Sequence, residues 1–268
     1  MPRPRRATGS IQVIDRAVAI LKCFSEQTPE LSVSELSRRL GLHKSTVSRI
    51  LASLEQNDLV SQNPETGRYR PGLGLIGLAG VALGRLGVRG AAQPYLPALV
   101  SLCQETVNVV VRDGAECVNI EREASPKAIQ YVGWIGRRMP LHCTAAGKVL
   151  LAALTPAERT ALLPAPLPRF TARTVTDPEQ LQAMLARVAA QGYAVDEGEF
   201  EEGFSAIAAP IRNHRGKVIA ALVISGPSFR LGAEVMASLR EPLLTTAAHI
   251  SADLGYVPGN SAGPEPRS

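Results

Sequence analysis

The chain has 268 residues, 45% of them hydrophobic, which is enough for two domains with real cores and excludes a globally disordered protein. The net charge of +5 is uneven, because residues 1–70 hold eleven Lys and Arg against seven Asp and Glu. A short basic module ahead of a nearly neutral remainder suits a polyanionic partner such as nucleic acid.

The four cysteines, Cys23, Cys103, Cys117 and Cys143, lack the spacing of a zinc site. Disulfide frameworks are typical of much shorter secreted chains, so we expect reduced thiols, no metal and a cytoplasmic protein. The basic first residues lead into no apolar run, which argues against a signal peptide. The most apolar stretch, 73–83, is shorter than the roughly 20 residues of a membrane-spanning helix, so no membrane partner is expected.

The N-terminal region begins with a predicted disordered basic arm at 1–9, followed by helical periodicity over 11–26. Ser32 and Glu35 have the spacing of a capping box, which satisfies two free N–H groups at the start of a helix. Gly41 is suited to end that helix, because glycine tolerates a positive φ.

A second helix follows this glycine almost at once, which predicts a helix-turn-helix. Its buried stripe consists of Val47, Ile50, Leu51 and Leu54. Two short strands, 59–62 and 68–71, surround a Pro/Gly turn and form a hairpin, or wing. We therefore assign residues 10–71 to a winged helix-turn-helix domain that binds double-stranded DNA.

The candidate DNA contacts are the cationic, hydroxyl and imidazole side chains that remain outside this stripe. They are His43, Lys44, Ser45, Thr46, Ser48 and Arg49 in the second helix, and Arg68 and Arg70 in the wing. Lys and Arg neutralise phosphate or bond to guanine, and hydroxyl groups bond to phosphate or base edges. The alternative is an ordinary solvated helix face and a hairpin whose charges serve solubility.

A Gly-rich helix is predicted at 72–89, as a linker and a candidate for pairing between subunits. The remainder divides into a domain at 90–256 and a disordered tail at 257–268. Helices are predicted at 94–106, 144–154, 178–191 and 232–254, and strands at 107–112, 116–120, 206–211 and 218–225. Asp113-Gly114 is a strong hairpin signal. Helices that cover an antiparallel sheet give an α+β class.

This second domain shows no catalytic constellation. His142 and Cys143 are adjacent on an extended segment, so they point to opposite faces and do not form a pair. Gly147-Lys148 lacks the flanking residues of a phosphate loop. The acidic run 196–202 is interpreted as a solvated loop, with Asp196 at a sheet edge or pocket mouth and a divalent metal site as the weaker alternative. We expect no enzyme activity and no cofactor.

The order of these elements, together with the run from Pro140 to Ala152, resembles the isocitrate lyase regulator (IclR) family. Gly192 to Glu197, Ile207 to Ile211 and Ile224 to Pro227 are also similar to that family. The resemblance extends over about residues 11–255. It implies a winged helix-turn-helix joined by a helix to a GAF-like effector domain, and a dimer or dimer of dimers on a palindromic operator.

The resemblance also implies a pocket for a small metabolite, often a carboxylate or aromatic acid. The corresponding positions are Ala128, Tyr131, Met139, Ala145, Ala146, Asp196, Phe204, Ala206, Val223 and Ser225. The N–H groups that start the helix at 144–147 are suited to hold a carboxylate. Our hypothesis is a transcriptional regulator, favouring repression, whose operator binding responds to a small organic or aromatic acid. The alternatives are a metabolite-binding enzyme with a vestigial helix-turn-helix, or a scaffold whose wing binds protein.

Overall fold

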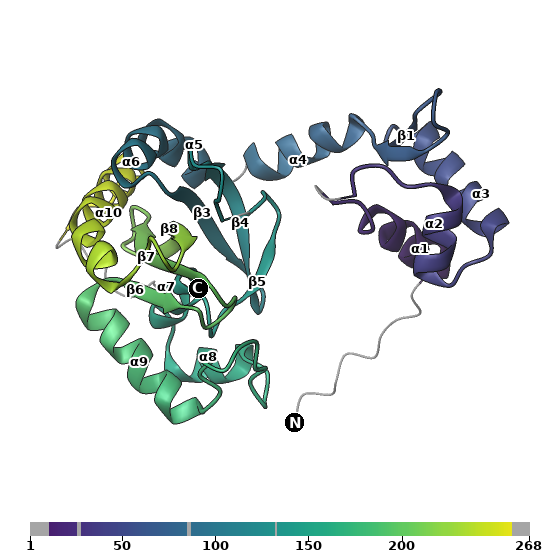
Figure 1. Cartoon of the computed structure of the whole chain (residues 1–268). Helices are drawn as coiled ribbons and strands as arrows, with labels where there is room; N and C mark the ends of the chain where they lie inside the picture. The colour runs from purple at the N-terminus through teal and green to yellow at the C-terminus, as the bar shows by residue number, and fades with distance from the viewer. Residues whose placement is uncertain (1–10, 26–27, 85–86, 132, 259–268) are drawn as a thin grey trace, which may run out of the picture. The chain divides into compact units, whose positions relative to one another are not determined.

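The computed structural model describes residues 11–25, 28–84, 87–131 and 133–258 (Figure 1). The chain divides between positions 85 and 86 into two compact units, which we call the reader unit and the sensor unit. The predicted arm at 1–9 and residues 259–268 of the predicted tail lie outside the described residues. The domain boundaries proposed from the sequence at 71/72 and 89/90 stay predictions.

The reader unit is a helix-turn-helix followed by a two-stranded antiparallel wing. Its elements are α1 (Gln12–Leu21), α2 (Val33–Leu40), α3 (Lys44–Gln56), β1 (Val60–Gln62), β2 (Tyr69–Pro71) and α4 (Gly74–Gly84). The prediction that the first helix continues to residue 26 is wrong. The helix ends at Leu21, and Ser25 then pairs with Thr28 in an isolated bridge.

The turn between α2 and α3 has the local chemistry that the sequence predicts. The Ser32 hydroxyl accepts from the Glu35 N–H at 3.3 Å, and the Glu35 carboxylate accepts from the Ser32 N–H at 2.8 Å. Gly41 ends α2 at φ 64°, in the left-handed region. The predicted stripe of α3 is buried and packs with Ile20, Leu36 and Tyr69. The hydrophobic contacts of three helices and the wing thus fix the orientation of α3.

The sensor unit mixes helices with one antiparallel sheet, which confirms the α+β class. Its helices are α5 (Gly87–Ala92), the 3-10 turn η1 (Gln93–Tyr95), α6 (Leu96–Cys103), α7 (Ala145–Ala152), α8 (Pro156–Leu162), α9 (Pro178–Gln191) and α10 (Ala233–Asp253). Its strands are β3 (Thr106–Asp113), β4 (Glu116–Glu123), β5 (Arg138–Pro140), β6 (Ala194–Glu197), β7 (Phe204–Arg212) and β8 (Val218–Pro227). The sequence did not predict α5, α8, β5 or β6 as separate elements.

The strands lie in the order β5-β4-β3-β8-β7-β6, and helices cover both faces of the sheet (Figure 1). Ala208 of β7 and Val223 of β8 join a core cluster with residues of α7 and α9. On the other face α10 packs against β7, and α6 packs against β3. Because both faces are covered, β8 is buried over most of its length. This arrangement places α7 across the middle strands, where the candidate pocket lies.

One predicted turn and one predicted helix end of the sensor unit lie one and three residues from their predicted positions. Asp113 pairs with Glu116, so the hairpin turn is Gly114-Ala115, with Gly114 at φ 59°. The helix predicted at 94–106 ends at Cys103, because Gln104 takes a left-handed conformation with φ 57°.

Candidate DNA interface and effector pocket

The start of α3 presents the predicted DNA-contact residues on the surface of the reader unit. His43, Lys44, Ser45, Ser48 and Arg49 are exposed, and Thr46 is half-buried. The same four apolar residues that the sequence assigned to the core hold this face outward. A helix with this exposed mixture of cations and hydroxyl groups suits the major groove of DNA.

His43 also has a role in the fold that the sequence did not predict. It is the N-cap residue of α3, and its Nδ1 accepts from the Ser45 N–H and lies 2.7 Å from the Ser45 hydroxyl. An N-cap satisfies one of the free N–H groups at a helix start. His43 therefore orders the first turn of the helix that carries the other candidate contacts.

The two arginines of the wing differ in their partners. Nη2 of Arg68 donates to both Glu35 carboxylate oxygens, at 2.9 and 2.8 Å, and to the Glu30 carbonyl. Hydrogen bonds from Ser32, and then from Arg68, lower the pKa of Glu35 to about 2. Arg70 is exposed, and its Nε donates to the Ser61 hydroxyl at 3.2 Å. Arg68 thus links the wing to α2, whereas Arg70 faces solvent.

The sensor unit holds a cavity of about 50 Å³ between the sheet and the start of α7. Nine of the ten predicted pocket residues line it: Tyr131, Met139, Ala145, Ala146, Asp196, Phe204, Ala206, Val223 and Ser225. Nine positions from distant segments of the chain therefore lie around one cavity.

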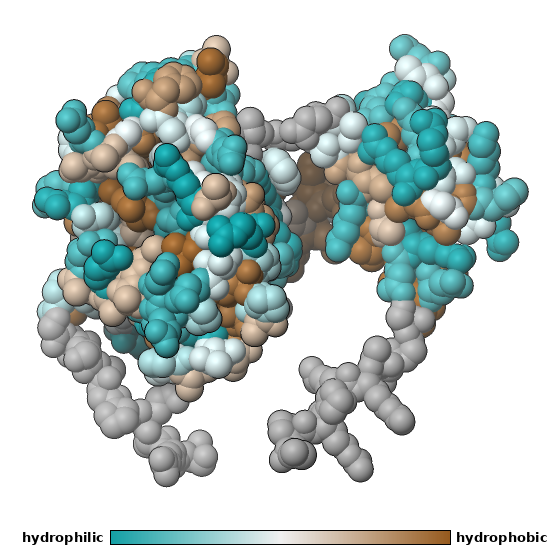
Figure 2. Space-filling view, turned by 60° about the horizontal axis from the view of Figure 1, so that its bottom comes forward, coloured by the Kyte–Doolittle hydropathy of each residue, from teal (hydrophilic) through white to brown (hydrophobic). Residues whose placement is uncertain are grey.

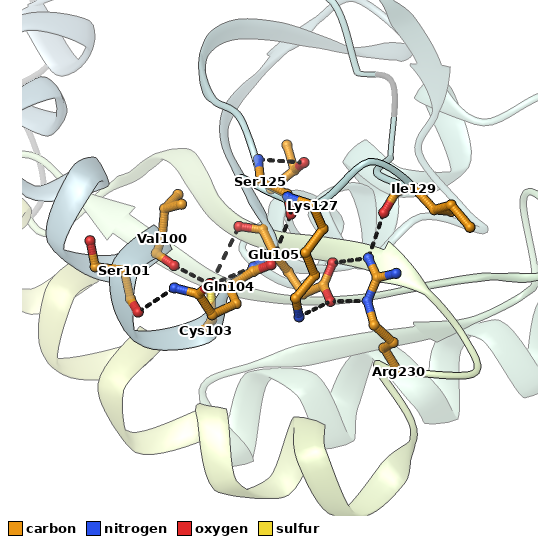
Figure 3. Close-up of polar contacts among 10 residues, drawn as sticks. Val100, Ser101, Cys103, Gln104, Glu105, Ser125, Lys127, Ile129 and Arg230 are labelled. Carbon is orange, nitrogen blue, oxygen red and sulfur yellow. Dashed lines mark hydrogen bonds and ion pairs between the residues drawn. The ribbon is translucent and has the colours of Figure 1, made fainter.

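Ala128 is the exception, since it is exposed and does not line the cavity. Figure 3 shows the polar contacts that hold its segment, residues 127–129, at the end of the sheet. The buried Glu105 carboxylate accepts from Arg230 at 2.6 and 2.9 Å and from Lys127 at 3.3 Å, while Arg230 also donates to the Ile129 carbonyl. These contacts hold the segment outside the cavity, so only its far end, at Tyr131, reaches the lining.

The lining is more polar than the sequence indicated. It also includes Asn108, Asn119, Thr144, Glu201 and Ser205, together with Val110, Gly133 and Phe200. Nδ2 of Asn119 donates to Asn108 Oδ1 at 3.1 Å, and Nδ2 of Asn108 donates to the Ser225 hydroxyl at 3.0 Å. The sequence held one signal for this polar lining. Asn108 and Asn119 interrupt apolar strands, and a buried amide needs polar partners.

At the start of α7 the Thr144 hydroxyl accepts from the Gly147 N–H at 3.1 Å. The N–H groups of Ala145 and Ala146 have no hydrogen-bond partner in the described part of the chain. Both residues line the cavity. Two unpaired N–H groups at the positive end of a helix dipole have the chemistry that favours an anion.

Asp196 reaches the cavity from the edge strand β6. It thus lies at a sheet edge and also at a pocket, the two positions considered for it from the sequence. Burial raises its pKa to about 7, although the Glu199 N–H and the charge of Lys148 act in the opposite direction. Lys148 itself is buried, and its Nζ donates to the Val195 carbonyl at 2.7 Å and to the Glu199 carboxylate. The lysine of the Gly-Lys pair therefore anchors β6 beside the cavity.

The rim of the cavity is formed by half-buried side chains of two loops. Arg137 pairs with Glu201 and donates to the Tyr131 hydroxyl at 3.0 Å. Its guanidinium also lies 5.2 Å from the Tyr131 ring centroid and 5.6 Å from that of Phe200. Arg137 was not predicted, and it joins the two loops at the cavity rim.

His142 and Cys143 do not form a nucleophilic pair. His142 Nε2 donates to the Pro168 carbonyl at 2.9 Å, and burial lowers the pKa of this imidazole. Burial raises the pKa of Cys143 well above its ordinary value. Among the described residues no three His, Cys, Asp or Glu side chains lie close enough together to hold a metal ion. The acidic run contributes Glu199 and Glu201 to ion pairs instead.

Comparison with known proteins agrees with this geometry. Residues 13–64 match the IclR helix-turn-helix domain, and residues 80–252 match the C-terminal domain of bacterial IclR transcriptional regulators. The chain belongs to the IclR family. As a member of this family it is a DNA-binding transcriptional regulator with an effector domain. No helix among the described residues is long and apolar enough to cross a membrane.

Its relatives include regulators from several bacteria. The chain is 39% identical to the transcriptional regulator XynR of Escherichia coli K12, over 92% of this chain and 98% of XynR. It is 35% identical to the transcriptional repressor AllR of the same strain, over 93% and 92% of the two chains. The crystal structure of Thermotoga maritima IclR matches with a TM-score of 0.78 at 29% identity, over 92% of this chain and all of that one.

A further structural relative was solved with a small molecule. It is an IclR homologue from Microbacterium hydrocarbonoxydans complexed with 4-hydroxybenzoate, with a TM-score of 0.76, 30% identity and coverage of 90% of this chain and 98% of that chain.

Proposed function

We propose that α3 reads a palindromic operator through Lys44, Ser45, Thr46, Ser48 and Arg49. The observation that carries this assignment is the exposed row of cations and hydroxyl groups on a helix whose opposite side is fully packed. Arg70 would contact phosphate from the wing, while His43 and Arg68 would position the two contacting elements. The names of the AllR relatives support repression.

The test is Arg49→Ala in a gel-shift assay with an operator selected from random DNA by the wild-type protein. We expect operator binding to be lost while circular dichroism stays unchanged, because a bidentate arginine–base or arginine–phosphate contact is removed. Arg187→Ala, an exposed arginine of α9, is the matched control and should bind normally. Normal affinity of the Arg49 variant would remove this residue from the interface, and a shallow salt slope would argue against phosphate contacts in general.

We propose further that the sensor cavity binds a small organic or aromatic acid that modulates operator binding. The unpaired N–H groups of Ala145 and Ala146 support a carboxylate ligand, and the 4-hydroxybenzoate complex of the structural relative supports an aromatic acid. A thermal-shift screen with small carboxylates tests this, since a ligand at about 100 times its dissociation constant adds about 2.7 kcal/mol of stability. If no acid shifts the melting temperature, this ligand class is wrong.

We propose that the sensor unit is a receptor and not an enzyme. The raised pKa of the Cys143 thiol and the engagement of His142 by a backbone carbonyl support this, because a nucleophilic cysteine needs a lowered pKa. Turnover of a bound acid that is lost in Cys143→Ser would favour the enzyme alternative. As a reader of chromosomal DNA, the protein would act in the cytoplasm.

We propose that a second copy of the chain covers exposed apolar side chains of the reader unit. Hydrophobic residues interrupt the hydrophilic surface of this unit in Figure 2. Among those exposed on or next to α1 and α4 are Ile11, Val13, Ile14, Val18, Leu73, Ile76, Leu78 and Val81. Exposed apolar side chains that gather on these two helices favour an interaction surface. Sedimentation equilibrium should show a dimer or tetramer, and Ile76→Glu with Leu78→Glu should shift it toward monomer.

A further inference from the structure

The strongest unexplained feature of the cavity is a buried acceptor without a donor. Asn119 is 1% exposed and lines the cavity, yet its Oδ1 has no hydrogen-bond partner among the described residues. The hydrogen bonds of Nδ2 fix the orientation of the Asn119 amide. Nδ2 donates to the Gly133 carbonyl at 2.6 Å, the Trp134 carbonyl at 3.3 Å and Asn108 Oδ1. Three acceptors around one nitrogen require that this nitrogen be the NH₂ group.

The remaining polar groups of the cavity do not supply the missing donor. The Asn108 NH₂ group donates to Ser225, the Thr144 hydroxyl donates to the Pro140 carbonyl, and the Tyr131 hydroxyl lies 3.6 Å from Met139 Sδ. A buried acceptor left without a donor is destabilising, and native proteins rarely keep one without a reason. The cavity therefore has one unsatisfied acceptor on β4 and unsatisfied N–H donors at the start of α7.

We infer that Asn119 selects effectors that carry a hydroxyl group or another hydrogen-bond donor in addition to the carboxylate. This inference rests on the proposed function, in which the carboxylate occupies the N–H groups of Ala145 and Ala146. The donor of the ligand would complete the chain of hydrogen bonds from Asn119 through Asn108 to Ser225. A hydroxylated acid matches both unsatisfied ends of the cavity, whereas an acid without the hydroxyl leaves Oδ1 unpaired.

The volume restricts the ligand further. A cavity of about 50 Å³ has room for only a few water-sized spheres, at roughly 10–15 Å³ each. Small hydroxy acids fit this space directly, and larger ones need the Arg137–Glu201 contact at the rim to open. Asn119 is a specificity residue because it discriminates by an unpaired buried group and not by size.

The experiment compares pairs of acids that differ by a single hydroxyl: glycolate with acetate, lactate with propionate, and 4-hydroxybenzoate with benzoate. Dissociation constants for the full-length wild-type protein come from calorimetry or thermal shift. We expect the hydroxylated member of at least one pair to bind about ten- to a hundredfold more tightly. In Asn119→Ala this ratio should fall to near one, whatever happens to the absolute affinity. The ratio is the informative quantity, since general damage to the pocket would weaken both members alike.

Three outcomes are distinguishable. Equal binding of both members by the wild-type protein overturns the role of Asn119 and leaves the proposed acid receptor standing, with water as the donor to Oδ1. Binding of neither member of any pair overturns the proposed ligand class, and the inference with it. A preference for hydroxy acids that persists in Asn119→Ala assigns the selection to another residue. If Asn119→Ala does not fold, Asn119→Leu provides the second variant, and the wild-type comparison alone still decides whether a hydroxyl is selected.

Discussion

The buried Asp196 makes the stability of the sensor unit depend on pH. Its pKa of about 7 in the folded protein lies above its ordinary value of 3.8, chiefly because burial disfavours the charged form. Between these values the folded state holds a proton that the unfolded state has released. The stabilisation from this proton is therefore fully present below pH 3.8 and is lost as the pH rises through 7. From pH 5 to pH 8 the loss is about 2.5 kcal/mol.

Asp196→Asn removes this dependence, because the amide stays neutral while its oxygen still accepts from the Glu199 N–H. We expect the unfolding free energy of the variant, relative to wild type, to rise by about 2.5 kcal/mol between pH 5 and pH 8. Trp134 is the only tryptophan of the chain, so its fluorescence in urea reports the sensor unit alone. Glu202→Gln, an exposed neighbour, is the control. A difference between Asp196→Asn and wild type that stays flat across this range would refute the reasoning.

Three other substitutions or treatments test the packing. Gly147→Ala should destabilise the sensor unit by about 3 kcal/mol or more in urea unfolding, because its Cβ would lie 2.0 Å from the Leu141 carbonyl oxygen. The control is Gly77→Ala, in a helix with free space around the glycine, which should be neutral or stabilising. Ser32→Ala should cost the reader unit about 1 kcal/mol in thermal unfolding followed by circular dichroism, because half of the capping box is lost; an unchanged melting curve would contradict that assignment. Iodoacetamide at pH 8 should leave Cys117 and Cys143 unlabelled until the protein unfolds, since both thiols are buried and the pKa of Cys117 is raised to about 12. Labelling is read by mass spectrometry, and rapid labelling of the native protein would show that the sensor core opens.

The reader unit could be predicted almost entirely from local signals. The Ser32–Glu35 box, Gly41 and the apolar stripe of α3 act over a few residues, and each one is visible in the sequence. The role of Arg68 could not be predicted in this way, because its partner Glu35 lies 33 positions away and only the fold brings the two side chains together. The exposure of Arg70 could be predicted, because side chains alternate along a strand and the adjacent Tyr69 is buried.

The positions predicted to line a pocket came from the family pattern and not from physical signals in the sequence. Tyr131, Asp196 and Ser225 come from three distant segments, and no local period relates them. The edge strands β5 and β6 were missed because each is only three or four residues long. Ala128 does not line the cavity, because its segment is held by Glu105 and Arg230, two charged residues whose pairing spans 125 positions. Long-range ion pairs of this kind leave no trace in composition or periodicity.

The strand order of the sensor unit has a consequence for the order in which the chain folds during synthesis. The central contact of the sheet joins β3 to β8, and the Asn108–Ser225 hydrogen bond across it links residues 117 positions apart. The edge of β3 that pairs with β8 stays unpaired until β8 has left the ribosome. The contacts of the reader unit span far fewer positions, such as 33 for Arg68 and Glu35, and the unit is complete far earlier, since domains fold as units. Each new chain therefore completes its DNA-binding surface before the cavity that is proposed to regulate it.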